Sequence, residues 1–248
     1  MDKPKQHSAQ YSLLFADDHL LVVNKAPGLL SIPDRFGHEK ENLLGLLQRQ
    51  YENVFTVHRL DRETSGILVF ARNEAAHRAL SMQFEQHLVD KFYLALLDGA
   101  LHHEEGEIDK PIGEHPTISG KMVVASWGKP SLTFYRVLER FAHFTLVEIQ
   151  LKTGRTHQIR VHFQSIGYPL AVDALYGRRA GLFLSEIKGK RYKTGKFSEE
   201  ERPLLGRTAL HAYRLRFEHP VSGERLEFKA DPPKDIQAVL AQLHKSGA

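Results

Sequence analysis

The sequence predicts an α+β fold with a mixed, mostly antiparallel β-sheet and flanking helices. In the 248-residue chain, segments with the pattern of a β-strand outnumber segments with helical periodicity. The strand-type segments also follow one another as hairpins, whereas a parallel sheet would alternate them with helices. No internal repeat and no convincing linker divides the chain. We therefore expect a flexible tail over residues 1–10 and a single domain over residues 11–248.

The first predicted elements are a hairpin and a short helix. Two apolar runs, residues 12–15 and 20–24, flank Asp17-Asp18, which is the pattern of a hairpin. The sequence Lys-Ala-Pro-Gly over residues 25–28 then ends the second strand with turn chemistry. Leucines that share one helical face predict a helix over residues 42–51.

The next predicted elements are two strands with a helix between them. Residues 66–72 form an apolar strand-type run, and Asn73 after it is a suitable helix N-cap. Residues 92–97 are apolar on both alternations and predict a strand that is buried on both faces. The apolar positions that recur every fourth residue of the helix are Ala76, Leu80, Phe84 and Leu88.

The second half of the chain predicts more strands than helices. Glycine, proline and charge in residues 101–130 indicate a long excursion of loops with short strands. Thr156 is a candidate N-cap, and Gly167 is a candidate helix stop. The predicted elements after the excursion are strands over 132–138 and 143–151, a helix from Thr156 to about Ser165, a basic segment over 178–203, a hairpin over 214–228 and a helix over 234–243.

Composition narrows the class of protein. Hydrophobic residues make up 42% of the chain, which is enough for a globular core. The chain has no cysteine, which excludes disulfides, thiolate zinc sites and cysteine nucleophiles. We see neither a secretory signal nor an apolar stretch approaching the ~20 residues that span a bilayer. The net charge of +4 favours a polyanionic partner over a membrane, and we expect a cytoplasmic protein.

One short segment, His58 to Gly66, places Asp61 between Arg59 and Arg62. A carboxylate held by cations stays ionised, as a nucleophile or general base requires. The alternative is a surface loop whose charges pair with one another and contribute about 0–1 kcal/mol. Spacing alone does not decide between the two interpretations.

A second segment, residues 152–160, places basic and amide side chains at the start of a helix. Helix N-termini favour anions, and Arg155 is well placed for a phosphate or carboxylate. Arg160 follows the inward Ile159, and a buried arginine needs a carboxylate, for which Asp61 is a candidate. The alternative is ordinary helix capping with exposed basic residues.

Two further features are ambiguous when taken alone. Tyr93 lies on an apolar strand, where a tyrosine packs in the core or presents its ring to a substrate base. Basic residues also gather in the excursion and in residues 188–196, where they suit phosphate contacts or a solvated surface. Phosphate-binding loops, dinucleotide fingerprints, nucleophile elbows and the His-Glu-x-x-His metal motif are all missing from the sequence.

Taken together, these segments resemble the RluA-type pseudouridine synthases. The resemblance spans roughly residues 11–233, with motifs that are long and correctly ordered. The segments that carry it are His58-Arg59-Leu60-Asp61, Thr64-Ser65-Gly66, Lys91 with Tyr93, Thr153 to His162, Gly167-Tyr168-Pro169, Gly177, Leu210-His211-Ala212, Asp17 to Gly28, and His219-Pro220 with Gly223.

The resemblance implies a fold and a set of roles. The fold would be one catalytic domain on a long, bent, mostly antiparallel sheet with a central active-site cleft. Asp61 would be the catalytic carboxylate and Arg160 its counter-ion, while Tyr93 would stack on a uracil flipped out of the RNA. Arg59 would fill the gap left by that nucleotide, and Arg155, His58 and Thr64 are further candidate RNA-binding residues.

The reaction that the resemblance implies is the isomerisation of uridine to pseudouridine in structured ribosomal or transfer RNA. It has no redox step and no group transfer, so we expect no cofactor and no metal. We expect a monomer without the small S4-type RNA-binding module that many relatives carry before the catalytic domain. Two alternatives remain: a non-catalytic RNA-binding or RNA-folding factor on the same scaffold, and an unrelated Asp-dependent hydrolase.

Overall fold

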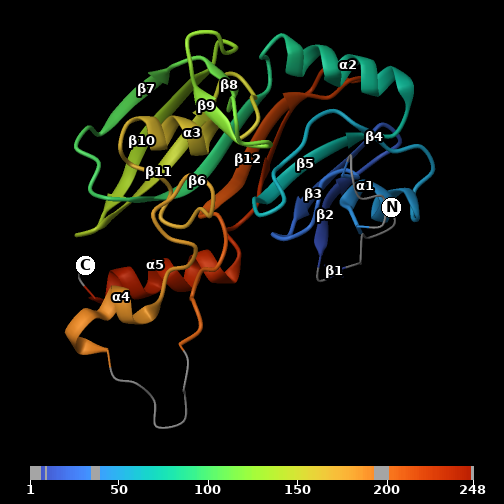
Figure 1. The fold of residues 1–248 in the computed structure, drawn as a ribbon. Coiled ribbons are helices and arrows are strands. Elements are labelled where there is room, and N and C mark those ends of the chain that lie inside the picture. Colours follow the sequence, from blue (N-terminus) through green and yellow to red (C-terminus); the bar gives the residue numbers. More distant parts are fainter. Residues whose placement is uncertain (1–6, 9, 35–39, 193–200, 247–248) are drawn as a thin grey trace. The chain divides into compact units, whose positions relative to one another are not determined.

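The computed structural model of the protein describes residues 7–8, 10–34, 40–192 and 201–246, which form two compact units. The first unit comprises Met1–Tyr93 and His211–Asp231, and the second comprises Leu94–Leu210 and Pro232–Ala248. The chain passes from the first unit to the second within strand β6 (Asp90–Asp98), and it returns at the start of strand β12 (Leu210–Glu218) (Figure 1).

In the first unit the strand order is β1-β2-β3-β5-β12. Strand β13 pairs with β12 and strand β4 pairs with β5, both antiparallel. The pair β5–β12 is parallel, with Ser65 opposite His211 and Gly66 opposite Ala212. The bounds of the remaining strands are His7–Ser8 (β1), Tyr11–Ala16 (β2), Leu20–Lys25 (β3), Phe55–Thr56 (β4), Ser65–Ala71 (β5) and Arg225–Lys229 (β13).

Two capped helices belong to the first unit. Helix α1 (Leu43–Gln48) begins after Asn42, whose side chain accepts from Gly45 N at 2.9 Å. Helix α2 (Glu74–Glu85) begins after Asn73, whose side chain accepts from Ala76 N at 2.9 Å. The buried core joins α2 to both segments of the unit, and its members include Leu20, Val22, Ile67, Val69, Ala76, Leu80, Leu215 and Phe217.

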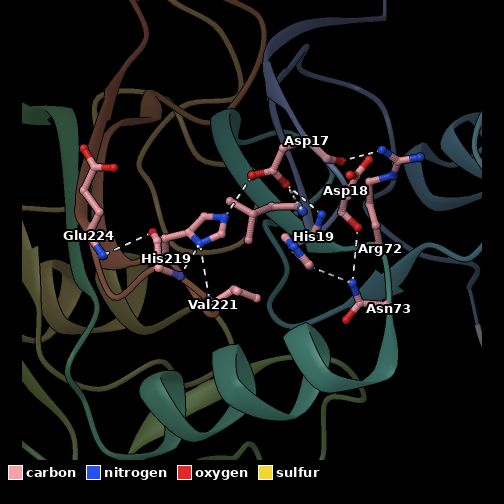
Figure 2. Close-up of polar contacts among 10 residues, drawn as sticks. Asp17, Asp18, His19, Arg72, Asn73, His219, Val221 and Glu224 are labelled. Atoms are coloured by element: carbon pink, nitrogen blue, oxygen red, sulfur yellow. Dashed lines mark hydrogen bonds and ion pairs between the residues drawn. The ribbon is translucent and has the colours of Figure 1, made fainter.

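A polar cluster joins the β2–β3 turn to the β12–β13 turn in the first unit (Figure 2). His219 Nε2 donates to Asp17 Oδ2 at 2.9 Å, and Arg72 donates to the Asp17 carbonyl. Burial alone would raise the pKa of Asp17, but backbone N–H groups of Leu20 and His19, together with His219, lower it. The cluster therefore links residues about 200 positions apart in the chain.

In the second unit strands β11, β10 and β7 follow β6 in the order of the sheet, and β8 and β9 form a separate hairpin. The pairs β10–β11, β10–β7 and β8–β9 are antiparallel. Their bounds are Glu105–Asp109 (β7), Ile112–Glu114 (β8), Met122–Val124 (β9), Leu132–Arg140 (β10) and Phe144–Leu151 (β11).

The helices of the second unit pack on this framework. Helix α3 (Gln158–Ser165) packs against β9 and β10, and α4 (Leu184–Lys188) lies beside α5 (Lys234–Ser246) (Figure 1). A short 3-10 helix, Gly189–Arg191, follows α4. The apolar core between them includes Leu96, Phe144, Val172, Leu182, Ile236, Val239 and Leu243.

The predicted α+β class with a mostly antiparallel sheet is confirmed. Helix α2 ends three residues before Leu88, which is therefore exposed, because His87 takes a left-handed φ of +57°. Residues 1–6 and 9 of the predicted tail, and residues 193–200 of the basic segment, lie outside the described residues. The single domain over residues 11–248 remains a prediction.

Candidate active site

Asp61 lies in a turn between β4 and β5, and hydrogen bonds hold the backbone on both sides of it. Thr64 N donates to the Asp61 carbonyl at 3.1 Å, which closes the turn. On the other side, Ser31 Oγ donates to the Leu60 carbonyl at 2.8 Å and accepts from Leu60 N at 3.1 Å. Leu60 is buried and Asp61 is partly exposed. The turn thus presents the carboxylate from an anchored backbone.

Lys25, at the end of β3, ties this turn to the preceding loop. Its side chain is fully buried. The ammonium donates to the carbonyls of Ala26 at 2.9 Å, Leu29 at 2.8 Å and Arg62 at 3.1 Å. In addition, Gly28 N donates to the Arg62 carbonyl at 2.9 Å. The ammonium thus joins the loop over residues 26–29 to the turn that carries Asp61.

The Thr64-Ser65-Gly66 motif joins β5 to β12. Ser65 Oγ lies 2.9 Å from His211 Nδ1, and His211 Nε2 lies 3.0 Å from the Ala230 carbonyl. Because Nε2 must donate to that carbonyl, Nδ1 is left to accept from the serine hydroxyl. Gly66 has a φ of +121°, and a Cβ there would lie 2.2 Å from the Ala212 carbonyl oxygen. Only glycine fits this crossing.

Tyr93 brings an uncharged phenol to the same site. Its side chain is 8% exposed. Burial raises the pKa of Tyr93 well above its usual value, and the negative charge of Asp61 raises it further. The tyrosine therefore stays neutral near Asp61.

His58 contributes to packing within the first unit. Its Nε2 accepts from Val69 N at 3.1 Å, and its ring stacks on Phe84 with centroids 4.5 Å apart. Burial, and then the positive charge of Lys91, lower the pKa of His58 to about 3. The imidazole is thus neutral and holds β5 against α2.

The two arginines beside Asp61 differ in their surroundings. The Arg62 Nε donates to the Gly28 carbonyl at 3.0 Å, and the same nitrogen lies 3.6 Å from Glu63. Arg59 is exposed and makes no hydrogen bond or ion pair with any residue that the structure describes. Arg59 is therefore available to a ligand.

In the second unit, Arg160 on α3 is held by a buried carboxylate. Its Nε and Nη2 donate to the two oxygens of Asp173 at 2.6 and 2.8 Å. Both residues are buried, and Asp173 Oδ1 also accepts from the backbone N–H groups of Leu175 and Tyr176. Burial alone would raise the pKa of Asp173, but Arg160 and these donors lower it. The pair is ionised and bidentate, which fixes the plane of the guanidinium.

Tyr176 supports this pair from its other side. Its ring centroid lies 4.9 Å from the Arg160 guanidinium carbon. Its hydroxyl accepts from Met122 N at 2.8 Å and lies 2.8 Å from His157 Nδ1. The same tyrosine therefore connects the β8–β9 hairpin to the start of α3.

The start of α3 differs from the sequence prediction. The N-cap is His157, with a φ of +56°, so the prediction of Thr156 as the cap was wrong. Gln158 organises the preceding loop, because its Oε1 accepts from Thr153 Oγ1 at 2.8 Å and from Arg155 N at 3.0 Å. Arg155 is partly exposed, and its Nε donates to the Pro130 carbonyl at 3.2 Å.

Comparison with known proteins identifies the family to which this architecture belongs. A sequence model described as RNA pseudouridylate synthase matches residues 19–165. This chain belongs to that family. The chain is 38% identical over 250 residues to a protein named ribosomal large subunit pseudouridine synthase D from Nitrosomonas europaea, covering 98% of this chain and 69% of the relative. It is also 38% identical to an uncharacterised RNA pseudouridine synthase of Bacillus subtilis, covering 95% and 73%.

Two solved structures share the fold of these synthases. Human RNA pseudouridylate synthase domain containing 1 aligns with a TM-score of 0.68 at 29% identity, over 93% of this chain and 87% of that one. Human RNA pseudouridylate synthase domain containing 4 aligns with a TM-score of 0.72 at 25% identity, over 94% and 92%. The predicted resemblance to the RluA-type synthases is confirmed.

Within the synthase's first unit, the charge of Asp61 acts on Tyr93, and the catalytic roles expected of both residues remain predictions. Arg160 lies in the second unit, where it pairs with Asp173, and its expected pairing with Asp61 remains a prediction. The RNA contacts expected of Arg59, Arg155, His58 and Thr64 likewise remain predictions. Thr64 is buried, so its backbone bond to Asp61 is the contact that the structure shows.

Sequence reasoning missed two residues that organise the synthase's candidate site, Lys25 and Asp173. Lys25 ends a strongly apolar strand, which is an unusual place for an ammonium. Asp173 is likewise a lone carboxylate in the apolar run Ala171 to Tyr176. Both are signals of a buried charge that requires partners. Among the described residues, no group of three or more His, Asp or Glu side chains is placed to hold a metal ion.

Proposed function

We propose that this protein isomerises uridine to pseudouridine in ribosomal RNA, with Asp61 as the catalytic carboxylate. One observation carries the proposal: Asp61 lies on an anchored turn beside a tyrosine that stays neutral. Membership of the family supports the reaction. The name of the Nitrosomonas europaea relative supports large-subunit ribosomal RNA as the substrate class, with transfer RNA to be tested alongside it.

The chemistry requires a carboxylate and a platform for the base. The bond from uracil nitrogen to the sugar breaks, the uracil turns while it stays bound, and a ring carbon rejoins the sugar. That carbon then loses its proton to solvent, and the freed nitrogen gains one. Asp61 either attacks the sugar carbon or removes a sugar proton. Extruding the base costs about a few kcal/mol, which stacking in the pocket offsets. In this proposal Tyr93 supplies the stacking surface.

Cations complete the proposed site. Arg160 would act as the counter-ion that keeps Asp61 ionised, and Asp173 fixes the orientation of its guanidinium. Arg59, which is exposed, would enter the space left by the flipped nucleotide. Arg155 would contact the RNA backbone, because lysine and arginine position nucleic acids through phosphate contacts.

The test compares two amide substitutions in one turn. Asp61→Asn keeps the size of the side chain but removes the charge, and it should abolish tritium release from uridine-labelled RNA. Glu63→Gln is the matched control, because it makes the same change of carboxylate to amide in the same turn on a side chain that is 44% exposed. RNA affinity should be the same for both variants. Undiminished release by the Asp61→Asn protein would contradict the proposal.

Mapping of pseudouridines identifies the substrate. Ribosomal and transfer RNA from cells with and without the protein should differ at one or a few uridines in ribosomal RNA. Expression of Asp61→Ala should leave those sites as uridine. Full restoration of a deletion phenotype by Asp61→Ala, with the pseudouridines unchanged, would favour the non-catalytic RNA-binding factor instead.

We also propose that both units act as one catalytic domain, as a cytoplasmic monomer without a cofactor. The family match supports the single domain, because residues 19–165 take in parts of both units. The reaction transfers no electrons and no group to a second molecule, so it needs no cofactor. In the part of the chain that the structure describes, no helix is long and apolar enough to cross a membrane.

A further inference from the structure

The one tryptophan of the chain, Trp127, is exposed on the second unit. Its side chain is 69% exposed, and it is the only aromatic among the large apolar side chains that are exposed in the described residues. Single exposed apolar residues are ordinary on protein surfaces. An indole is a different case when the backbone holds it in place and basic residues surround it, because it then offers a rigid flat face to a ligand.

Backbone contacts hold the turn that carries Trp127. Gly128 N donates to the Ala125 carbonyl at 2.9 Å, which closes a turn with Trp127 inside it. Directly after Gly128, Lys129 pairs with Ile112: Ile112 N donates to the Lys129 carbonyl at 3.0 Å, and Lys129 N donates to the Ile112 carbonyl at 2.8 Å. A Cβ on Gly128 would lie 2.4 Å from the Ile112 carbonyl carbon, so the two segments cross in close contact.

The indole itself packs by one edge. A Cβ on Gly113 would meet Trp127 Nε1 at 3.0 Å and Cδ1 at 3.4 Å, so the ring edge occupies the space above that glycine. The rest of the ring is exposed to solvent. Since the ring is already positioned, little side-chain entropy would be lost on binding, which favours a stacking contact.

The charges around this turn favour a polyanion. Residues 110–130 contain three lysines, Lys110, Lys121 and Lys129, and one carboxylate, Glu114. Lys129 is exposed two residues after Trp127. Arg155, the candidate RNA-binding residue of the α3 loop, donates to the Pro130 carbonyl at 3.2 Å. A guanidinium therefore lies at the base of the turn.

The turn is also joined, through the hydrogen bonds between Lys129 and Ile112, to a small apolar cluster beside Arg160. Ile112, Val161 and Tyr176 form a buried group against which Met122 and Val124 pack. Tyr176 lies on the Arg160 guanidinium and accepts from Met122 N. The hairpin is thus fastened to α3, and Trp127 is held on the same body as the proposed counter-ion of Asp61.

We propose that Trp127 is a stacking platform for an unpaired nucleobase of the substrate RNA other than the target uridine. Lys129 and Arg155 contact the phosphates that flank this base. The inference rests on the proposed function in one respect, that the substrate is RNA. Stacking tolerates any base, so the platform selects unpaired over paired RNA more than it selects sequence.

Trp127 is its own reporter, because no other tryptophan contributes fluorescence. Deproteinised ribosomal RNA should quench the tryptophan emission of the Asp61→Asn protein, in which no turnover occurs. A fully paired RNA duplex should quench it much less. Unchanged emission at saturating ribosomal RNA would overturn the inference.

Substitution gives the second readout. Trp127→Ala should weaken RNA binding by roughly tenfold and raise KM with kcat unchanged, while Trp127→Phe retains most of the affinity. Val221→Ala is the matched control, because Val221 is 61% exposed on the first unit. Equal RNA affinity of wild type and Trp127→Ala would overturn the inference. Lower modification in cells with equal RNA affinity would indicate that Trp127 binds a protein partner, which also contradicts the inference.

The two proposals fail separately. Quenching of Trp127 emission by RNA without any pseudouridine formation would support the stacking platform and contradict the proposed enzymatic function. Tritium release with wild-type kinetics in Trp127→Ala, together with unchanged emission of the Asp61→Asn protein on addition of RNA, would rule out the platform and leave the enzymatic function in place.

Discussion

Replacing Lys25 by methionine tests how far the Asp61 turn depends on one buried ammonium. The substitution keeps the length of the side chain and removes three hydrogen bonds, to the carbonyls of Ala26, Leu29 and Arg62. Bonds from a charged group contribute about 1.5–3 kcal/mol each, so the gross loss is roughly 5–9 kcal/mol.

Two effects reduce this loss. The bonds to Ala26 and Arg62 are partly buried, so water can replace the ammonium there, while the bond to Leu29 is fully buried. Removal of the charge also recovers several kcal/mol of desolvation cost. We therefore expect the free energy of unfolding to fall by about 2–4 kcal/mol.

Activity should fall together with stability. The Arg62 carbonyl directly follows Asp61, so loss of the ammonium, one of the two donors to that carbonyl, lets the carboxylate shift. A displacement of about 1 Å can cost ~100-fold in rate, and we expect a loss of that order in tritium release with RNA affinity unchanged.

Stability is measured by urea unfolding with far-ultraviolet circular dichroism, because the exposed Trp127 reports poorly on the first unit. Lys229→Met is the control. This lysine is 64% exposed and pairs with Glu227 at 3.0 Å, so its loss should change the unfolding free energy by less than about 0.5 kcal/mol. Wild-type unfolding energy together with wild-type activity in Lys25→Met would refute the reasoning.

Two further predictions concern the frame of the first unit. Gly66→Ala should destabilise the protein by more than ~3 kcal/mol or prevent folding, because its Cβ would collide with the Ala212 carbonyl, whereas Gly223→Ala, which has open space, should cost about 1 kcal/mol. The low pKa of His58 predicts acid sensitivity. In the unfolded chain His58 is protonated below pH ~6.5, whereas in the folded protein it stays neutral down to about pH 3. The free energy of unfolding therefore falls by ~1.4 kcal/mol for each unit by which the pH is lowered in this window. His58→Gln should lack this slope in urea titrations, and an identical slope in both proteins would contradict the assignment.

Local signals in the sequence were sufficient for most of the elements. Asn73 was recognised as a cap because an Asx side chain satisfies a free N–H, and the structure shows that bond. Helix α2 nevertheless ends before Leu88, because His87 adopts a left-handed backbone that sequence rarely signals in a residue other than glycine or asparagine. His157 displaced Thr156 as a cap for the same reason.

The candidate site was harder to predict from the sequence than the elements, because it depends on contacts between distant segments. The sequence shows that a buried Arg160 needs a carboxylate, but it does not rank Asp61 against Asp173, since the choice depends on how distant segments pack. Asp173 is the partner that the structure shows, held by N–H groups of its own loop. Lys25 was overlooked because its partners are backbone carbonyls, which no side-chain pattern can reveal.

The division of the chain into two discontinuous units has a consequence for synthesis. Leu215 and Phe217 complete the core of the first unit, and Ile236, Val239 and Leu243 complete that of the second. The 117 residues from 94 to 210 separate the two segments of the first unit and take about 6–23 s to translate at ~5–20 residues per second. Neither core can be completed during that interval. Apolar strands such as β5 therefore remain without part of their packing partners until the end of the chain has been translated.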